Sequence, residues 1–317
     1  MALKLKIAVI GTGIIGGNHL RAIAKSESAE LCALCDVNEA VVAPLAEKYE
    51  VPYFTNYKEI VEKTDAEAVI LNLPHWLHCE VTEFFLNHGL HVLVEKPMAN
   101  TVAECDRMIL AAERSGKKLA VGHVQRYYGA LRKVKEIYQS KELGELCMYT
   151  EMRSGDFFAP ERPKWFLDKA LSGGGMVMNI GAHVLDKLFY VLECEPMQVF
   201  ATYDNVKNDC SIESHGQIHI RFENKVSANI TLNGCGNCGS ENVFYFSEGA
   251  IKIAGGKRMS KNVGNGWEEV PLETKDDPFF QQLEEFCKLV KDEPSEIVTA
   301  DYGRRVIKTI ERIYDCK

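Results

Sequence analysis

The sequence lacks any apolar stretch of about 20 residues, the length that a helix needs to cross a bilayer. It also lacks an excess of basic residues, since 37 Lys and Arg stand against 45 Asp and Glu and the formal net charge is −8. This balance argues against a surface for nucleic acid or for an anionic membrane. Internal repeats and low-complexity segments are absent too, so the chain has the composition of an ordinary globular protein.

Cysteine is present, but its number and setting do not favour disulfides. Eleven cysteines are an odd number in a chain of this length. In the first residues, Lys4 and Lys6 alternate with apolar residues and the run breaks at Gly11, which is typical of a strand and a turn and not of a secretory signal. We therefore expect reduced thiols and a cytoplasmic location.

Metal-site patterns are incomplete. Cys32 and Cys35 lie in an apparent strand, where their side chains face opposite sides. Cys235 and Cys238 lie in a Gly- and Asn-rich segment that predicts a loop; a redox or metal role is the alternative, but no second pair of ligands has zinc-site spacing. The histidine pairs 75/78 and 88/91 lack a carboxylate or cysteine that would complete a site. We predict no metal.

Length and rhythm indicate two domains, because 317 residues are too many for one ordinary core. Residues 1–123 alternate short apolar runs with helical patterns, which predicts a doubly wound parallel sheet covered on both faces. The predicted strands are Leu5–Ile10, Leu31–Cys35, Ala68–Leu73, Val92–Glu95 and Leu119–Val121, and the predicted helices span 14–25, 39–49, 57–63, 78–88 and 101–115.

Residues 124–317 have a different rhythm, with longer alternating runs and hairpin-like breaks. This pattern predicts an α+β domain with a large open, mainly antiparallel sheet that is covered on one face. We leave open whether the C-terminal helix packs back on the first domain. The predicted strands are Cys147–Arg153, Gln198–Tyr203, Gly216–Phe222, Val226–Leu232, Val243–Phe246 and Ala250–Ile253, and the predicted helices are Gly129–Ser140, Gly181–Leu192, 278–291 and 299–315.

A glycine-rich turn follows the first predicted strand. Gly11, Gly13 and Gly16 form G-x-G-x-x-G, open a helix and precede Asp36, twenty residues further on at the end of the second strand. This context predicts a dinucleotide site, in which the first glycine makes the turn, the second admits the pyrophosphate and the third lets the helix pack closely. Between these glycines lie Thr12, Ile14 and Ile15, which we expect to line the cofactor.

The end of the second strand also indicates which cofactor binds. A carboxylate at Asp36 accepts hydrogen bonds from ribose hydroxyls and repels a 2′-phosphate. Val37 and Asn38 follow, with no arginine to accommodate that phosphate. The sequence therefore favours NAD over NADP.

Two further segments end strands at the carboxyl edge, where such a fold holds its ligand. Lys96 follows the fifth predicted strand, beside Glu95, and the segment "LNLPHWLH" ends the preceding strand. We expect Lys96 to face the nicotinamide and the substrate hydroxyl. The other predicted cofactor contacts at this edge are Asn72, Leu73, Pro74, His75, His78 and Glu95.

Five motifs, which follow one another along the chain, make it resemble the glucose–fructose oxidoreductase/inositol dehydrogenase/MocA family over essentially its whole length. The motifs are "GTGIIGGNH" at 11–19, "LNLPHWLH" at 71–78, "EKP" at 95–97, "GHVQRY" at 122–127 and "GGGMVMNIGAHVLD" at 173–186. The resemblance implies a Rossmann domain, an α/β domain whose open sheet forms oligomer contacts, and a nicotinamide enzyme that acts on sugar or cyclitol hydroxyls.

By position, the resemblance implies that Lys96 is the acid/base or hydroxyl-binding lysine and that His183 is the histidine of the second domain. Asn179 stands where the family often has Asp, so it holds a hydroxyl but cannot take a proton. The i, i+4 spacing places Asn179 and His183 on one helical face. Asp186 either orients the imidazole or has a structural role. The remaining expected substrate contacts are Gln125, Arg126 and Trp165, for each of which a structural role is an equal alternative.

Together these features predict NAD-dependent hydride transfer between nicotinamide and the hydroxyl of a sugar, sugar derivative or cyclitol. The alternatives are an NAD-dependent glycosidase that oxidises the sugar transiently, an oxidoreductase of non-sugar diols or carbonyls, and a non-catalytic NAD sensor. We also expect a cis Lys96–Pro97 bond, as the resemblance suggests. The second sheet has too few helices to cover both faces, which predicts a homodimer or homotetramer through it.

Overall fold

The computed structural model describes residues 3–207, 209–272 and 277–316. The chain forms two compact units, divided in sequence between Val124 and Gln125. The C-terminal part is split between them, because the described residues from 277 to Arg305 belong to the first unit and those from Val306 to the second. Our prediction from the sequence instead places one boundary after residue 123 and assigns residues 124–317 to the second domain.

The first unit contains a six-stranded sheet in which every pair is parallel, in the order β3-β2-β1-β4-β5-β6. This order confirms the predicted doubly wound sheet. The strands are β1 (Leu5–Ile10), β2 (Ala29–Cys35), β3 (Tyr53–Phe54), β4 (Ala68–Leu71), β5 (His91–Glu95) and β6 (Leu119–Gly122). The helices are α1 (Ile14–Lys25), α2 (Glu39–Tyr49), α3 (Glu59–Lys63), α4 (His78–Asn87), α5 (Val102–Ser115) and α9 (Pro278–Val290).

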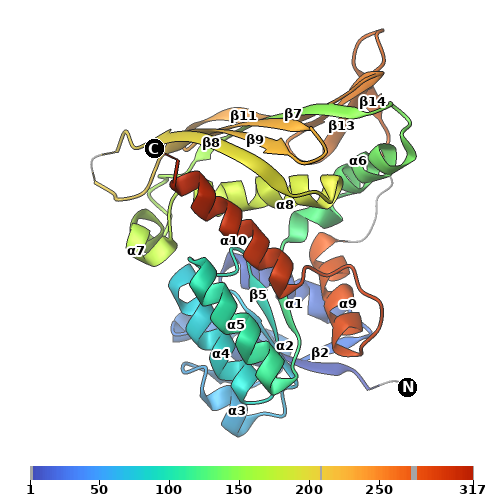
Figure 1. Ribbon diagram of the computed structural model, residues 1–317. Coiled ribbons are helices and arrows are strands. Elements are labelled where there is room, and N and C mark those ends of the chain that lie inside the picture. The colour runs from blue at the N-terminus through green and yellow to red at the C-terminus, as the bar shows by residue number, and fades with distance from the viewer. Residues whose placement is uncertain (1–2, 208, 273–276, 317) are drawn as a thin grey trace. The chain divides into compact units, whose positions relative to one another are not determined.

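Local signals explain where these elements begin. Thr101 and Glu104 form a capping box at the start of α5, and the Asn38 side chain caps α2. The central strands β1, β4 and β5 are almost wholly buried, as expected of parallel strands covered on both faces. Helices α1 and α9 pack together on one layer and α4 and α5 on another (Figure 1).

The second unit contains an eight-stranded sheet in the order β14-β13-β12-β11-β7-β10-β9-β8. All its pairs are antiparallel except β7 with β10, which confirms a mainly antiparallel sheet. The strands are β7 (Leu146–Asp156), β8 (Pro196–Asp204), β9 (His215–Phe222), β10 (Ser227–Asn233), β11 (Cys235–Phe246), β12 (Gly249–Ala254), β13 (Arg258–Asn262) and β14 (Glu268–Val270). The helices are α6 (Gly129–Ser140), α7 (Lys169–Ser172) and α8 (Ala182–Leu192), and α10 (Ala300–Tyr314) spans the division between the units.

Helix α8 covers one face of this sheet (Figure 1). Alternate residues of β10 are buried, and Phe189 of α8 meets Phe222 of β9 edge to face. The opposite face of the sheet carries polar residues together with Met148 and Met152 of β7 and Phe200 of β8, which are exposed. The predicted loop at Cys235 and Cys238 is wrong, because both residues lie at the start of β11, where a register shift lets the strand bulge.

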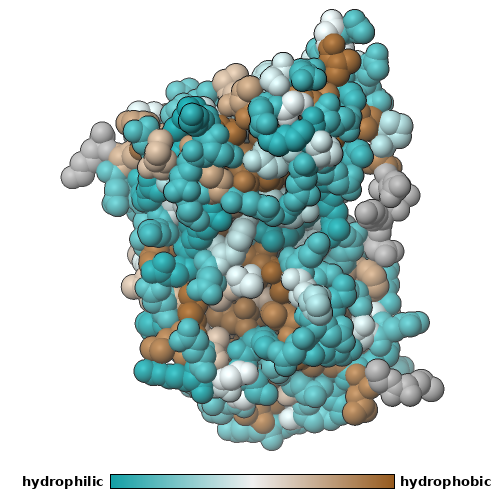
Figure 2. Space-filling model, turned by 45° about the vertical axis from the view of Figure 1, so that its right-hand side comes forward, coloured by the Kyte–Doolittle hydropathy of each residue, from teal (hydrophilic) through white to brown (hydrophobic). Residues whose placement is uncertain are grey.

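No helix in the described part of the chain is long and apolar enough to span a bilayer. The face drawn in Figure 2 is mostly hydrophilic, with hydrophobic residues in separate groups.

Candidate active site

The glycine turn after β1 has a shape that only glycine permits. Gly11 has a φ of +84°, and a Cβ on it would lie 2.4 Å from the carbonyl oxygen of Asn72. A Cβ on Gly16 would lie 2.2 Å from the carbonyl oxygen of Gly11, so glycine at this position lets α1 pack against the turn. Gly13 has no atom within 4 Å of an added Cβ, so this side of the turn is open.

The start of α1 supplies hydrogen-bond donors at that open side. Gly13 is the N-cap residue, no side chain caps the helix, and the first turn contains no acidic residue. The first N–H groups of α1 are therefore available to phosphate oxygens, and the helix dipole favours an anion there. Ile14 is 90% exposed and Ile15 is 42% exposed. The residues present thus fit the pyrophosphate of a dinucleotide.

Asp36 is fixed beside the same turn. Its Oδ2 accepts hydrogen bonds from the Thr12 backbone N–H at 2.7 Å and from the Thr12 hydroxyl at 3.0 Å. Its Oδ1 accepts from the Asn38 backbone N–H at 3.0 Å. The carboxylate is therefore oriented by its neighbours and brings its charge to the glycine turn.

The segment after β4 is tied to both the glycine turn and the β5 edge. The Asn72 side-chain amide donates to the Gly11 carbonyl at 3.2 Å. The buried His78 ring, at the start of α4, lies 2.8 Å from the carbonyl oxygens of both Leu73 and Pro97. Burial lowers the pKa of His78, and the hydrogen bonds to the two carbonyls oppose that shift. Pro74 precedes a short 3-10 helix that carries the buried His75.

The "EKP" segment leaves β5 through a buried carboxylate. Glu95 Oε1 lies 2.9 Å from His19 Nε2, and its Oε2 accepts from the Lys96 backbone N–H at 3.2 Å. The Lys96–Pro97 bond is cis, as predicted, and the Lys96 side chain is half-buried. His19 was not predicted as a site residue. The feature that could have identified it is its position three residues after Gly16, on the face of α1 that packs on the sheet.

In the second unit, Asn179 lies in a π-helical turn, Val177–Gly181, directly before α8. The predicted start of α8 at Gly181 is within one residue of the observed start at Ala182, but the π turn before it was not predicted. The predicted i, i+4 relation between Asn179 and His183 assumed α-helical geometry, which does not hold across a π turn. Asn179 is buried and His183 is half-buried.

Arg126 and Asp186 form a buried ion pair, with Arg126 Nη2 2.6 Å from Asp186 Oδ1. The Arg126 guanidinium also lies 5.2 Å from the centroid of the Tyr190 ring. The structure thus ties Asp186 to an arginine that was predicted to contact substrate. Gln125 is half-buried beside it, and Trp165 stacks on Phe166 with the ring centroids 3.7 Å apart.

A second buried ion pair anchors α8 and was not predicted. Lys187 Nζ lies 2.8 Å from Glu151 Oε1, and Arg153 Nη1 lies 3.3 Å from the same oxygen. The Tyr149 hydroxyl donates to Glu151 as well. Burial raises the pKa of Glu151, but the cations and hydrogen bonds outweigh it and the pKa is lowered, while burial lowers the pKa of Lys187. The sequence signal is a lysine within the apolar run of α8.

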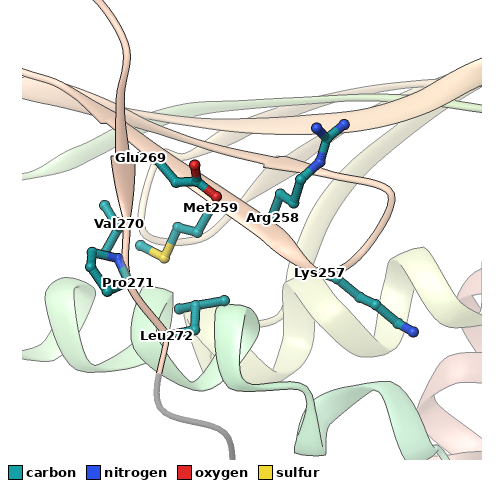
Figure 3. Close-up of a pocket in the computed structure, with 7 residues that line it drawn as sticks. All are labelled: Lys257, Arg258, Met259, Glu269, Val270, Pro271 and Leu272. Atoms are coloured by element: carbon teal, nitrogen blue, oxygen red, sulfur yellow. The ribbon is translucent and has the colours of Figure 1, made fainter.

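The cysteines and the surface pocket do not add residues to the candidate site. All eleven cysteines are free, and no group of three or more His, Cys, Asp or Glu among the described residues could hold a metal ion. Burial raises the pKa of Cys32 and of Cys35 to about 12. A surface pocket of about 450 Å³ lies at β13 and β14, lined by the residues in Figure 3, and none of them is a predicted site residue.

The strand order, the glycine turn and the acidic residue at the end of β2 together define a dinucleotide-binding fold of the doubly wound class. Two models of one family match the chain. The model described as "Oxidoreductase family, NAD-binding Rossmann fold" matches residues 5–123, and the "GFO/IDH/MocA C-terminal domain" matches residues 131–252. The chain belongs to the glucose–fructose oxidoreductase/inositol dehydrogenase/MocA family.

Similar proteins include the 1-carboxy-3-chloro-3,4-dihydroxycyclo hexa-1,5-diene dehydrogenase of Comamonas testosteroni, 33% identical over 59% of this chain and 47% of that protein. The inositol 2-dehydrogenase of Salmonella typhimurium is 33% identical over 46% of this chain and 45% of its own length. The matches thus span about half the length of these curated relatives. The crystal structure of aldose-aldose oxidoreductase from Caulobacter crescentus, complexed with glycerol, superposes with a TM-score of 0.91 at 25% identity, covering 98% of this chain and 97% of that one.

Proposed function

We propose that this protein is an NAD-dependent oxidoreductase that interconverts a hydroxyl and a carbonyl on a sugar, sugar derivative or cyclitol. The observation that carries the proposal is the glycine turn, where Gly13 is open and α1 begins without a side-chain cap. A site of this kind binds phosphate groups through backbone N–H groups. The named activities of relatives, inositol 2-dehydrogenase among them, support a polyol substrate.

The chain's own residues would divide the work as follows. The N–H groups at the start of α1 hold the pyrophosphate, and Asp36 accepts the ribose hydroxyls. The bound nicotinamide supplies the hydride acceptor. Lys96 or His183 takes the proton from the substrate hydroxyl, and Lys96 in its charged form stabilises negative charge on that oxygen. Asn179 holds a neighbouring hydroxyl by a hydrogen bond.

The cofactor is proposed to be NAD. The Asp36 carboxylate is fixed by Thr12 and Asn38, so it cannot turn away from an incoming 2′-phosphate without breaking these hydrogen bonds. The next side chain, Val37, is apolar and 89% exposed, so it offers no cation to that phosphate. Fluorescence titration should therefore show NADH binding at least about 10-fold tighter than NADPH, the cost of one unfavourable charge contact. Tighter binding of NADPH would contradict the assignment.

The activity itself is tested with a panel of sugars, cyclitols, glycosides and non-sugar diols in the presence of NAD. NADH formation and product release are followed in parallel. Net NADH formation on a sugar or cyclitol supports the proposal. Release of free sugar from a glycoside without net NADH would indicate a glycosidase, and tight NAD binding with no reaction in the whole panel would indicate a sensor.

We also propose a homodimer or homotetramer formed through the second sheet, in a cytoplasmic protein. Exposed Met148, Met152 and Phe200 on the side opposite α8 support the assembly. The eleven free thiols support a reducing compartment. Sedimentation velocity at micromolar concentration should show the oligomer, and Phe200→Glu together with Met152→Glu should dissociate it. A stable wild-type monomer would count against this assembly.

A further inference from the structure

The segment between β7 and α7 contains an arginine with an unusual environment. Arg162 is half-buried against two aromatic rings that meet edge to face, with its guanidinium carbon 4.1 Å from the centroid of Phe157 and 4.9 Å from the centroid of Phe166. Contact with two rings restricts the motion of the guanidinium. The side chain is therefore ordered by its neighbours before any ligand arrives.

Arg162 differs from four other arginines of the chain in its charge partners. Arg107, Arg126, Arg153 and Arg304 each contact a carboxylate. Across residues 3–207, 209–272 and 277–316, no carboxylate lies within 4.0 Å of the Arg162 guanidinium, and its buried Nε has no acceptor. Within the same residues, neither terminal nitrogen of Arg162 forms a hydrogen bond or an ion pair.

This arrangement leaves a partly desolvated cation without a close counter-ion. Burial lowers the pKa of Arg162, and the exposed Asp156 opposes that shift at longer range. A half-buried charge of this kind is stabilised when an anion binds to it, because the desolvation has already occurred. The cation is thus preorganised for an anionic ligand.

Phe157, one of the two rings that contact Arg162, packs near the segment that leads to Asn179. The Phe157 N–H donates to the Gly234 carbonyl at 2.9 Å. An added Cβ on Gly234 would lie 2.9 Å from Phe157 Cβ and 3.1 Å from Met176 Cγ. Met176 comes directly before the π turn Val177–Gly181, which contains Asn179. The aromatic support of Arg162 therefore packs next to the chain that positions a proposed substrate contact.

We propose that Arg162 binds the anionic group of an acidic sugar, so that the preferred substrates are sugar carboxylates or sugar phosphates. This inference rests on the proposed function, since it names the substrate class of the same site. The guanidinium presents two parallel N–H donors at its edge, which match the two oxygens of a carboxylate or phosphate. The stacked Trp165 and Phe166 pair adds an apolar surface beside it.

The test measures binding by titration calorimetry on the full-length protein saturated with NADH. The probes are D-glucose, D-glucuronate and D-glucose 6-phosphate, which share a ring and differ in charge and in the source of that charge. We expect at least one anion to bind about 10-fold or more tighter than glucose, as a desolvated charge-assisted pair provides. The difference between the two anions distinguishes a carboxylate site from a phosphate site.

Three variants separate a binding role from a structural one. Arg162→Met keeps an apolar chain against the two rings and should abolish the preference for the anion while glucose binding changes little. Arg162→Lys keeps the charge without the fork and should retain part of the preference. Lys164→Met removes an exposed cation two residues away and should leave the preference unchanged. Thermal unfolding of each variant shows whether the fold is kept.

Equal binding of glucose and both anions by the wild type, or no measurable binding of either anion, would overturn the proposal. A preference that survives both Arg162→Met and Arg162→Lys would overturn it as well. NADH formation on neutral sugars without an anion preference would leave the oxidoreductase standing and remove only this site. Arg162-dependent anion binding with no NADH formation on any sugar would support the anion site and contradict the proposed oxidoreductase activity.

Discussion

The glycine turn of the first unit and helix α8 of the second unit position candidate site residues by different physical means. The turn works through backbone shape, because Gly11 and Gly16 allow approaches of 2.4 and 2.2 Å that a Cβ would prevent. Helix α8 works through side chains, because the buried Lys187 and Asp186 pair with Glu151 and Arg126. A site formed by backbone atoms can be identified from a short sequence motif. A helix that is held by ion pairs depends on charged residues that lie far apart in the sequence.

The largest expected effect is that of a Lys96 variant on turnover. Lys96→Ala should lower turnover by about 10²–10⁴-fold, the usual loss for a general acid or base, with NADH affinity kept within a few-fold. Cofactor affinity is retained because it derives from the turn, the start of α1 and Asp36. His183→Ala should lower turnover more mildly if Lys96 is the base.

The matched control for Lys96→Ala is Lys25→Ala, an exposed lysine at the end of α1. It should leave steady-state kinetics unchanged. Full turnover of Lys96→Ala on a verified substrate would mean that Lys96 only binds cofactor or serves the local structure around Glu95.

The second prediction concerns the anchor of α8. Lys187→Met leaves Glu151 buried without its closest cation and should lower the free energy of unfolding by about 3–5 kcal/mol, as removal of one partner from a buried pair does. Lys133→Met is the control, because Lys133 pairs with Glu136 at the surface of α6, where such pairs contribute about 0–1 kcal/mol. Chemical denaturation measures both. A similar small loss in the two variants would show that the Glu151–Lys187 pair does not anchor the helix.

The double variant Glu151→Gln/Lys187→Met removes both charges, and it should recover most of the stability that Lys187→Met loses. It also tests the pH dependence. The folded pKa of Glu151 is lowered below its ordinary 4.5, so its contribution is present above that pH and is lost as the pH falls through the folded pKa. The wild type should therefore lose more stability than the double variant between about pH 5 and pH 3. Parallel losses would contradict the lowered pKa.

The same contrast explains what the sequence could predict. Apolar runs and helical periodicity placed the five predicted strands of the first unit and the nine predicted helices within two residues of their observed limits. The two-residue strand β3 was missed because it is too short to form a pattern and Tyr53 is exposed. The first half of β11 was missed because its glycine and polar residues resemble a loop, yet they extend a strand that pairs with β7.

In the candidate site, the cofactor motif could be predicted because its parts are close in sequence and in space. The pairs of α8 could not, because Glu151 is 36 residues from Lys187 and Arg126 is 60 from Asp186. Hydrophobic periodicity places a helix but does not name the partner of a buried charge. The π turn at Asn179 was also hidden, since one additional residue in a turn leaves the composition of a helix unchanged.

The smallest expected effect belongs to Asn179. Asn179→Ala should raise KM several-fold and leave turnover almost unchanged, because the amide supplies a hydrogen bond, worth about 0.5–1.5 kcal/mol, and no proton. Asn179→Asp restores the carboxylate that the family often has and nearly preserves the shape of the side chain. If that position only holds a hydroxyl, turnover should persist within a few-fold and its pH profile should keep the same limbs. A new limb in the pH profile, together with faster turnover, would show that the carboxylate takes part in proton transfer and that this chain works with one ionisable group fewer. Steady-state kinetics from pH 5 to 10 on the best substrate of the panel distinguishes the two outcomes.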